Sequence, residues 1–239
     1  MRKMQDMPES MGYPTPNPDC PRCHGAGFLY PLDQGKPDYS QVVPCKCYQN
    51  SLQGWILSPD ALRGRGIDTR QTFDSFQVVN GTGEAYEAAR DFASASCNII
   101  LFLLYGGVGN GKSFLCNATA LVLLEKSIDT HLYSVADLLA ELRQRIKDNT
   151  IEEKVQWLKE IPALILDDYK PEYQSEWAAS RLEEIIDFRY RNLLLTMMTT
   201  NRNLTELPER ITSRFSDNEI AKRVLNSGKD YRRRKQDRK

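Results

Sequence analysis

Between about residues 68 and 218, short apolar runs alternate with segments in which apolar residues recur every three or four positions. The runs are too short for helices, which is typical of strands buried on both faces of a sheet. They are Asn98–Tyr105, His131–Ser134, Pro162–Leu166 and Leu193–Thr200. The helical spacing occupies residues 84–95, 113–126, the stretch after Ser134, 151–160, 175–191 and 207–215. This alternation predicts an α/β fold with a parallel sheet and flanking helices. Ser134 with Asp137 predicts a capping box at one helix start.

The composition is that of an ordinary globular protein. The 239 residues are 41% hydrophobic and 27% charged, which excludes collagen-like, low-complexity and wholly disordered classes. No apolar run reaches the length of about 18 residues that a membrane-spanning helix needs. The first residues lack the apolar core of a signal peptide, so we expect a cytoplasmic protein with no membrane partner.

Basic and acidic residues balance at 32 each, but they are unevenly distributed. Residues 229–239 contain seven basic and two acidic side chains, so the rest of the chain is net acidic. This distribution disfavours a basic coat for nucleic acid over the whole surface. The basic tail is a local exception to this balance, and a solvated chain end is the simplest interpretation of it.

Prolines, glycines and cysteines predict how the chain divides into parts. Residues 1–19 contain four prolines without periodicity and predict a flexible arm. Residues 20–50 hold four of the six cysteines and predict a metal-binding module, and residues 51–67 contain the helix-breaking residues of a linker. The periodic residues 68–218 predict the core, and residues 219–239 a short basic lid or tail.

A phosphate-loop pattern lies between a predicted strand and a predicted helix. Eight consecutive residues match G-x4-G-K-[ST]: Gly106, Gly107, Val108, Gly109, Asn110, Gly111, Lys112 and Ser113. Glycines let successive backbone N–H groups face phosphate oxygens, Lys112 supplies a charge for the β- and γ-phosphates, and the Ser113 hydroxyl can hold Mg²⁺. The dipole of the following helix also favours phosphate. The pattern therefore predicts nucleotide binding with Mg²⁺.

Two carboxylates follow the apolar run Ala163-Leu-Ile-Leu. Parallel strands end at one edge of their sheet, so Asp167 and Asp168 are expected beside the phosphate loop. We predict that Asp167 binds Mg²⁺ through water and that Asp168 polarises the attacking water. An acidic turn without chemistry is the interpretation that the strand alone would favour.

Four further motifs accompany these elements: Arg70-Gln-Thr-Phe-Asp-Ser-Phe76, Thr199-Thr-Asn201, Arg210-Ile-Thr-Ser-Arg-Phe215 and Asp230-Tyr-Arg232. Together with the phosphate loop they resemble AAA+ ATPases, and within these the helicase loaders of the DnaC/DnaI type, to which IstB-type transposition ATPases are similar. The resemblance covers about residues 68–232 and the cysteine module in front. It implies a P-loop AAA+ core that hydrolyses ATP as a conformational switch.

The resemblance also implies roles for three residues outside the phosphate loop. Asn201 is then the sensor-1 residue that orients water near the γ-phosphate. Arg214 is an arginine finger acting on a neighbouring subunit's nucleotide, and Arg232 is the sensor-2 arginine. The family often continues its acid pair with an aliphatic residue and glycine, whereas this chain has Tyr169 and Lys170, which leaves the placement of Asp168 open.

Two close cysteine pairs precede the predicted core. Cys20 and Cys23 are separated by two residues, and Cys45 and Cys47 by one. In the cytoplasm such a cluster favours a metal over disulfides, and four thiolates suit a tetrahedral structural Zn²⁺. Free thiols are an alternative, and His24 is an alternative ligand. Cys20 to His24 also matches the attachment motif of c-type haem, which the second cysteine pair and the missing export signal disfavour.

The resemblance implies a helicase loader that self-assembles on a DnaB-type hexamer and passes it to single-stranded DNA in replication, with the zinc module engaging the helicase. A transposition ATPase that serves a transposase and target DNA is the main alternative. A P-loop kinase would use residues 136–160 as a substrate-binding insertion, but it has no use for Asn201 and Arg214. A zinc adaptor that binds nucleotide without turnover is a fourth hypothesis.

Overall fold

The computed structural model describes residues 17–30, 32–33, 36–37, 43–48, 57–96, 98–170 and 175–231. The chain forms two compact units, residues 1–61 and residues 62–239. Most of the predicted flexible arm, part of the predicted linker, and Arg232 with the rest of the basic tail lie outside the described residues.

The smaller unit contains two short antiparallel ladders and a cysteine cluster. β1 (Phe28–Leu29) pairs with β4 (Val43–Pro44), and β2 (Leu32–Asp33) pairs with β3 (Lys36–Pro37). The buried cluster consists of Cys20, Cys23 and Cys45, with Leu29 and Cys47 packed against it. The described core of this unit is thus made chiefly of cysteines, which is typical of small modules that a metal stabilises.

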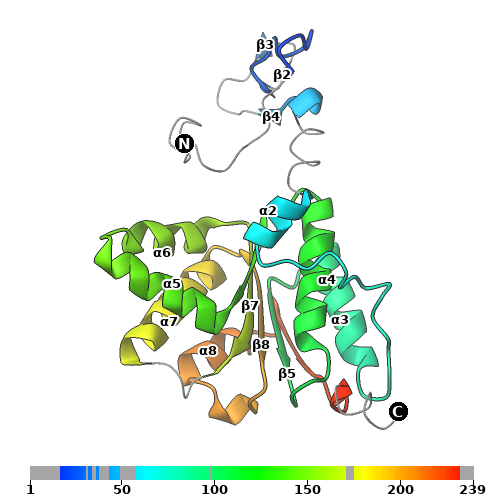
Figure 1. Ribbon diagram of the computed structural model, residues 1–239, viewed down its shortest axis with the longest axis vertical. Helices are drawn as coiled ribbons and strands as arrows, with labels where there is room; N and C mark the ends of the chain where they lie inside the picture. The colour runs from blue at the N-terminus through cyan, green and yellow to red at the C-terminus, as the bar shows by residue number, and fades with distance from the viewer. Residues whose placement is uncertain are drawn as a thin grey trace. The chain divides into compact units, whose positions relative to one another are not determined.

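Parallel strands form the sheet of the larger unit (Figure 1). In the described residues their order is β6 (Thr130–Ser134), β7 (Ala163–Tyr169), β8 (Leu195–Thr200), β5 (Leu101–Tyr105) and β9 (Ala221–Leu225). Leu101, Phe102, Leu103 and Leu104 of β5 are fully buried, as expected for a strand covered on both faces. The predicted parallel sheet is confirmed.

Helices cover both faces of this sheet (Figure 1). One face carries α3 (Gly83–Ser94) and α4 (Lys112–Glu125), and the other carries α5 (Val135–Lys147), α6 (Ile151–Glu160), α7 (Glu176–Arg191) and α8 (Glu209–Arg214). A short helix, α2 (Pro59–Gly64), spans the boundary between the units, and a 3₁₀ turn, η4 (Leu204–Glu206), follows β8. The main core lies under α5 to α8. Of the helices that the structure describes, none has the length and apolar character needed to cross a membrane.

Two expectations about local structure are corrected. Ser134 is the N-cap of α5, but its side chain makes no capping hydrogen bond, so the capping box predicted with Asp137 does not form. Part of the segment 219–239, expected as a lid or tail, is the edge strand β9, which pairs in parallel with β5. In β9 only Ala221 and Val224 are buried, so this strand lacks the continuous apolar run by which the others were predicted.

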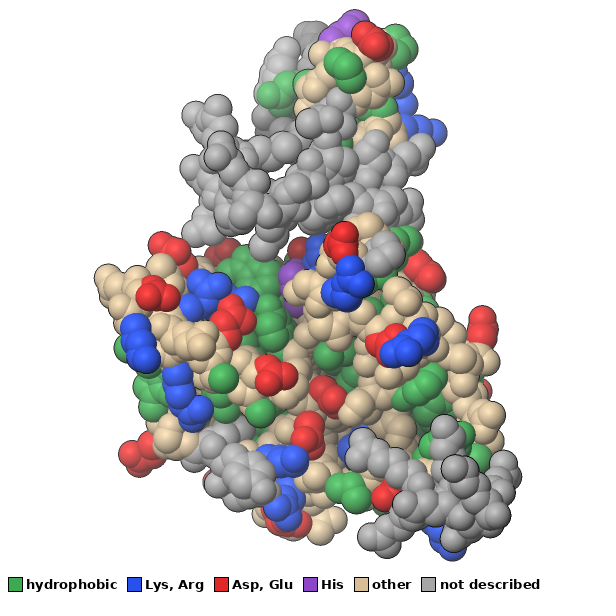
Figure 2. All heavy atoms as spheres, in the orientation of Figure 1, with side chains coloured by type: hydrophobic (Ala, Val, Ile, Leu, Met, Phe, Trp, Pro, Cys, Tyr) green, Lys and Arg blue, Asp and Glu red, His purple; other side chains and the backbone are tan. Residues whose placement is uncertain are grey.

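The surface charge of the larger unit is mixed. On the face drawn in Figure 2, Lys and Arg side chains are interspersed with Asp and Glu side chains. This pattern agrees with the balance of 32 basic and 32 acidic residues. The described residues of this face therefore form no continuous basic surface to which a nucleic acid could bind.

Arg189, in the last turn of α7, is fully buried. Its guanidinium donates hydrogen bonds to the carbonyls of Leu158 (2.9 Å), Ile161 (2.7 Å) and Leu195 (2.6 Å), at the end of α6 and at the approaches to β7 and β8. Its Nε also donates to Thr196 Oγ1 at 2.9 Å. Burial lowers the pKa of Arg189 to about 9, so the side chain stays charged at neutral pH. One side chain thus fixes the starts of two neighbouring strands.

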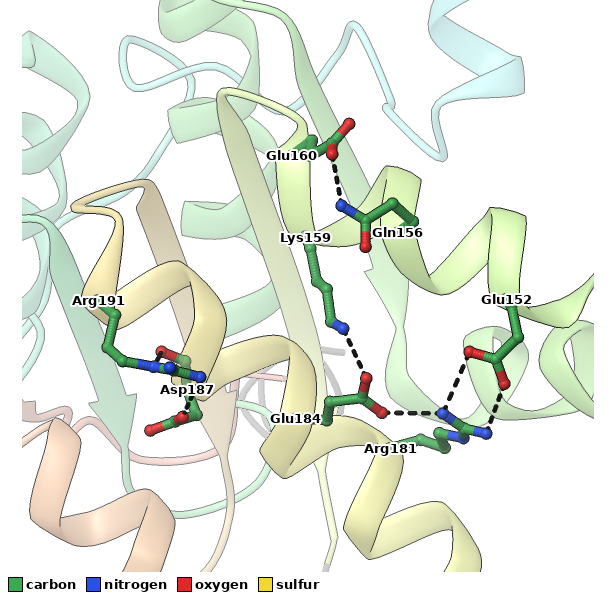
Figure 3. Close-up of polar contacts among 8 residues, drawn as sticks. All are labelled: Glu152, Gln156, Lys159, Glu160, Arg181, Glu184, Asp187 and Arg191. Carbon is green, nitrogen blue, oxygen red and sulfur yellow. Dashed lines mark hydrogen bonds and ion pairs between the residues drawn. The ribbon is translucent and has the colours of Figure 1, made fainter.

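Ion pairs also join α6 to α7 (Figure 3). Lys159 Nζ lies 2.5 Å from Glu184 Oε1, and Arg181 lies 2.9 Å from Glu184 and 2.7 Å from Glu152. Partly exposed pairs of this kind contribute about 0–1 kcal/mol each. We therefore expect the buried hydrogen bonds of Arg189 to matter more for stability than this network.

Arg189→Met should destabilise the larger unit by about 3 kcal/mol or more, because each buried carbonyl that loses its donor keeps its cost of desolvation. Urea denaturation followed by circular dichroism would show this as a lower midpoint. Arg191→Met is the matched control, since Arg191 pairs with Asp187 (2.8 Å) at the surface and should change stability by about 0.5 kcal/mol or less. Equal midpoints for the two variants would contradict the role given to Arg189.

Candidate functional site

A pocket of about 660 Å³ opens where the strands of the sheet end. β5 leads into the phosphate loop 106–113, Asp167 and Asp168 lie near the end of β7, directly before Tyr169, and Asn201 follows β8. Most of these residues line the pocket. Residues from the segment 71–82 and from the C-terminal part of the unit complete the lining. The volume is typical of ligand-binding clefts. The structure thus brings the phosphate loop, both acids and Asn201 into one place.

Close packing requires glycine at two positions of the phosphate loop. Gly106 (φ 136°) lies against the carbonyl of Asn226, and Gly109 (φ 70°) lies against the carboxylate of Asp230. A Cβ at either position would collide with these oxygens. Both backbone conformations also lie in the region that side chains disfavour. The loop can therefore adopt this path only because it is rich in glycine.

Lys112 begins α4 and is only 8% exposed. Its Nζ donates to the carbonyls of Gly106 (2.9 Å) and Gly107 (2.6 Å) and to Asn110 Oδ1 (3.1 Å). Burial lowers the pKa of Lys112, and the carboxylates of Asp167 and Asp168 oppose this shift. The ammonium group of Lys112 therefore lies at the start of α4, where the backbone N–H groups of the loop also gather. This arrangement suits phosphate.

Residues 226–231, here called the C-terminal strap, pack against the phosphate loop. Asn110 Nδ2 donates to the Asn226 carbonyl (2.7 Å), and Asn226 Nδ2 donates to the Asn110 carbonyl (3.1 Å). Both residues are buried, and the Tyr231 backbone N–H donates to the Gly109 carbonyl (2.8 Å). Sequence reasoning missed Asn226, because the pair joins positions 116 residues apart and no local pattern marks it.

A β-bulge places the two acids. Leu166 pairs with Met198 and Tyr169 pairs with Thr200, so two residues of β7 stand opposite one residue of β8. Asp168, with φ 58°, lies within this bulge. The bulge shifts the alternation of the strand, since Leu166 and Tyr169 both lie in the same core cluster. Tyr169 is buried as a result, and the two carboxylates before it are left at the pocket.

Polar contacts hold these acids from several sides. Thr199 Oγ1 donates to Asp167 Oδ1 (2.5 Å) and accepts the backbone N–H of Asp168 (3.0 Å). Cys116 Sγ lies 3.8 Å from the same Asp167 oxygen, and Lys170 Nζ lies 2.6 Å from Asp168 Oδ2. The sequence motifs gave Thr199 no role of its own, and Cys116 is fully buried beside Asp167.

The residues at this pocket fit a nucleoside triphosphate with Mg²⁺. Lys112 and the loop N–H groups suit phosphate oxygens. The Ser113 hydroxyl and the Asp167 carboxylate are the hard oxygen donors that Mg²⁺ prefers, and both line the pocket. Asn201 lines it as well, where an amide can orient water. The individual roles stay predictions.

The two predicted arginines are not part of this arrangement. Arg214 ends α8, where its guanidinium lies 2.8 Å from Asp187 Oδ1 and 5.2 Å from the ring centre of Tyr190. Its side chain is 36% exposed, and it is absent from the described lining of the pocket. An arginine that serves a neighbouring subunit must lie outside its own pocket in this way. Arg232 lies outside the described residues.

The four clustered cysteines lie close enough to bind one metal ion. The sulfurs of Cys20, Cys23, Cys45 and Cys47 all lie within 4.8 Å of one another, with 3.8 Å between Cys20 and Cys45. Sulfurs bound to a tetrahedral Zn²⁺ are about 3.8 Å apart, since the Zn–S bond is about 2.3 Å. The backbone N–H groups of Cys23 and Arg22 lower the pKa of Cys20 to about 6, which favours the thiolate that a metal needs.

His24 is not part of this cluster. Among the described residues, the group that could hold a metal consists of the four cysteines, and the His24 side chain is exposed. The loop is fixed by hydrogen bonds from His24 N–H to the Cys20 carbonyl (2.8 Å) and from Cys45 N–H to the Gly27 carbonyl (2.7 Å). Four thiolates leave no open position on Zn²⁺, so a metal here would be structural.

Known proteins resemble the larger unit. The model of the family described as the bacterial DnaA ATPase domain matches residues 67–221. The replicative helicase loader DnaI of Bacillus subtilis (strain 168) is 32% identical over 110 residues, which is 46% of this chain and 35% of DnaI. The replicative helicase loader DnaC of Escherichia coli (strain K12) is 25% identical over 157 residues, which is 64% of each chain. The chain thus spans about a third of DnaI and less than two thirds of DnaC.

The fold also has a counterpart among solved structures. AMPPCP-bound DnaA from Aquifex aeolicus matches with a TM-score of 0.61 at 22% identity, covering 67% of this chain and 51% of that one. At this identity the likeness concerns the fold alone. The parallel sheet with flanking helices described above is therefore a fold that the larger unit shares with that DnaA structure.

We expect the purified chain to carry about one Zn²⁺ and Cys45→Ser to lose it, because three thiolates and a hydroxyl bind zinc far more weakly than four thiolates. His24→Ala should keep its zinc, since His24 lies outside the sulfur cluster. Inductively coupled plasma mass spectrometry of chelator-free protein measures both. Full zinc in Cys45→Ser, or loss in His24→Ala, would overturn this ligand set.

Proposed function

This chain belongs to the bacterial DnaA ATPase-domain family, and on that premise we propose that it is an ATP-dependent replicative helicase loader. Its nucleotide state would switch an assembly that delivers a DnaB-type hexamer to single-stranded DNA during replication. The similarity to the helicase loader DnaC, which extends over 64% of both chains, carries this proposal. The 32% identity to the loader DnaI supports it.

The pocket supports ATP hydrolysis by positioning and charge. Lys112 binds the β- and γ-phosphates, Asp168 polarises the attacking water and Asn201 orients it. A Mg²⁺ ion held by Ser113 and Asp167 supplies further positive charge for the phosphates. Hydrolysis then serves as a timing step for the assembly and not as a metabolic reaction.

Arg214 acts in trans in this proposal. Its half-exposed guanidinium lies outside the pocket of its own chain, and its partner Asp187 is also at the surface. A guanidinium from a neighbouring subunit neutralises charge in the transition state only after subunits assemble. Hydrolysis would then report on assembly.

The cysteine module contacts the helicase in this proposal. A closed four-thiolate site supplies structure and no catalysis, which suits a binding module. Contacts to DNA phosphates come from Lys and Arg and are sensitive to salt, and the basic tail is one candidate for them. Whatever the partner, the zinc module and the ATPase unit have separate tasks.

An initiator of the DnaA type is the second candidate, because the matching family model describes a DnaA domain. A transposition ATPase would share the pocket and differ in its partner, a transposase with target DNA. A kinase or a nucleotide-binding adaptor would differ in turnover, since neither hydrolyses ATP upon assembly. These functions can therefore be distinguished by identifying the binding partner and by measuring ATP hydrolysis.

Native mass spectrometry of the full chain with the replicative helicase of its own host, ATP and Mg²⁺ should show a helicase hexamer carrying several copies of this chain. Full-length Cys45→Ser should not form the complex, because the module that contacts the helicase loses its metal. His24→Ala is the matched control and should bind. Absence of any complex with an active helicase would contradict the loader function, and a complex with a transposase would establish the alternative.

Lys112→Met and Arg214→Ala should each lose ATP hydrolysis, and a mixture of the two should recover it. The Lys112→Met subunit supplies the arginine, and the Arg214→Ala subunit supplies an intact pocket. Arginine fingers contribute about 10³-fold or more to the rate, so Arg214→Ala alone should fall by about that factor. A phosphate-release assay measures all three samples.

Arg210→Ala is the control for this experiment. Arg210 lies on the same helix and pairs with Glu183 (3.5 Å) at the surface, so its loss should leave hydrolysis close to the wild-type rate. If the two inactive variants assemble with each other and the mixture stays inactive, Arg214 is not the arginine that acts in trans.

A further inference from the structure

We propose that the hydroxyl of Thr199 positions both acids of the pocket, a role that rests on the proposed ATP hydrolysis. Thr199 is fully buried in β8 and borders the pocket. Its Oγ1 donates to Asp167 Oδ1 at 2.5 Å and accepts the backbone N–H of Asp168 at 3.0 Å. A single side-chain oxygen is thereby bonded to two consecutive acidic residues.

The bulge in β7 explains why this contact exists. Asp167 and Asp168 both stand opposite Thr199, so the regular ladder between β7 and β8 is interrupted at this point. A buried or half-buried backbone N–H that loses its ladder partner needs another acceptor. The Thr199 hydroxyl supplies it for Asp168, whose φ of 58° is unusual for a residue with a side chain. The hydroxyl therefore holds the bulge in the conformation that presents Asp168.

The same hydroxyl also orients the carboxylate of Asp167. A threonine hydroxyl has one proton, and its lone pair here accepts from the Asp168 N–H, so the proton points to Asp167. The contacts from Thr199 and Cys116 both fall on Oδ1, and no described residue bonds Oδ2. Oδ2 is left for the pocket, where Asp167 would hold Mg²⁺ through water. Thr199 thus determines which carboxylate oxygen of Asp167 faces the metal position.

Thr200 is adjacent but has a different task. Its Oγ1 donates to the Tyr169 carbonyl at 2.8 Å and accepts the backbone N–H of Arg202 at 3.1 Å. These bonds hold the backbone beyond the bulge and reach neither acid. The positioning role therefore belongs to Thr199 and not to the pair of threonines.

Thr199→Val keeps the shape of the side chain and removes its hydroxyl. Mn²⁺, used in place of Mg²⁺, is titrated into the nucleotide-loaded protein and followed by electron paramagnetic resonance, and hydrolysis is measured in parallel. We expect about 10- to 100-fold weaker metal affinity and a similar fall in kcat, as for other residues that orient metal ligands. Nucleotide affinity measured with EDTA should not change. Thr199→Ser, which restores the hydroxyl, should recover both quantities.

Thr119→Val is the matched control. Thr119 is also fully buried, on α4, and its hydroxyl has no hydrogen-bond partner in the described part of the chain. Its replacement should leave metal affinity and kcat unchanged. If Thr199→Val does not fold, Thr199→Ala removes the hydroxyl without adding a methyl group beside the acids, and the same expectations apply.

A folded variant without the hydroxyl that binds Mn²⁺ and turns over like the wild type would overturn the proposal. So would a Thr199→Ser variant as impaired as Thr199→Val. If the wild-type chain binds nucleotide but does not hydrolyse it, the proposed function fails. The Mn²⁺ titration alone then decides the role of Thr199.

Discussion

All strands of a parallel sheet end at the same edge when their connections run over its faces, and the candidate site depends on this constraint. β5 leads the phosphate loop to one pocket, β7 brings the two acids there, and β8 brings Thr199, with Asn201 directly after the strand. The buried side chains of β5 and the helices on both faces keep the strands from sliding. Arg189 adds a fixed point at the opposite ends of β7 and β8. The packing of the core therefore fixes the positions of the site residues at the edge of the sheet.

Much of this arrangement was readable from local patterns. The apolar runs predicted four strands, and the glycine-rich loop and acid pair predicted the pocket, because each depends on neighbouring residues and on the parallel direction of the sheet. β9 was missed because an edge strand need not be apolar along its length, and in β9 only Ala221 and Val224 are buried. The bulge was missed because it depends on how two strands pair. No local sequence pattern in β7 indicates that Asp167 and Asp168 will both lie opposite Thr199.

The match to the family model lies within one of the two units. The family model begins at residue 67, within the larger unit, and does not extend to the cysteine module. What the match supports is therefore the ATPase fold. In the described part of the cysteine module, four sulfurs lie within 4.8 Å of one another and form most of the buried cluster, an arrangement typical of modules that a metal stabilises. The two units thus have different kinds of buried core, one made chiefly of cysteines and one made of aliphatic and aromatic side chains.

The contact between the C-terminal strap and the phosphate loop sets an order of events during synthesis. The chain is made from its N-terminus, so Asn110 leaves the ribosome 116 residues before Asn226, the residue that it pairs with. Until β9 and the strap have docked, β5 lacks its outer neighbour and the loop lacks its support. A nascent chain can therefore contain the complete phosphate-loop sequence without a complete pocket. A ligand of this pocket therefore stabilises chains that have been made through to the strap, because these chains have the complete site.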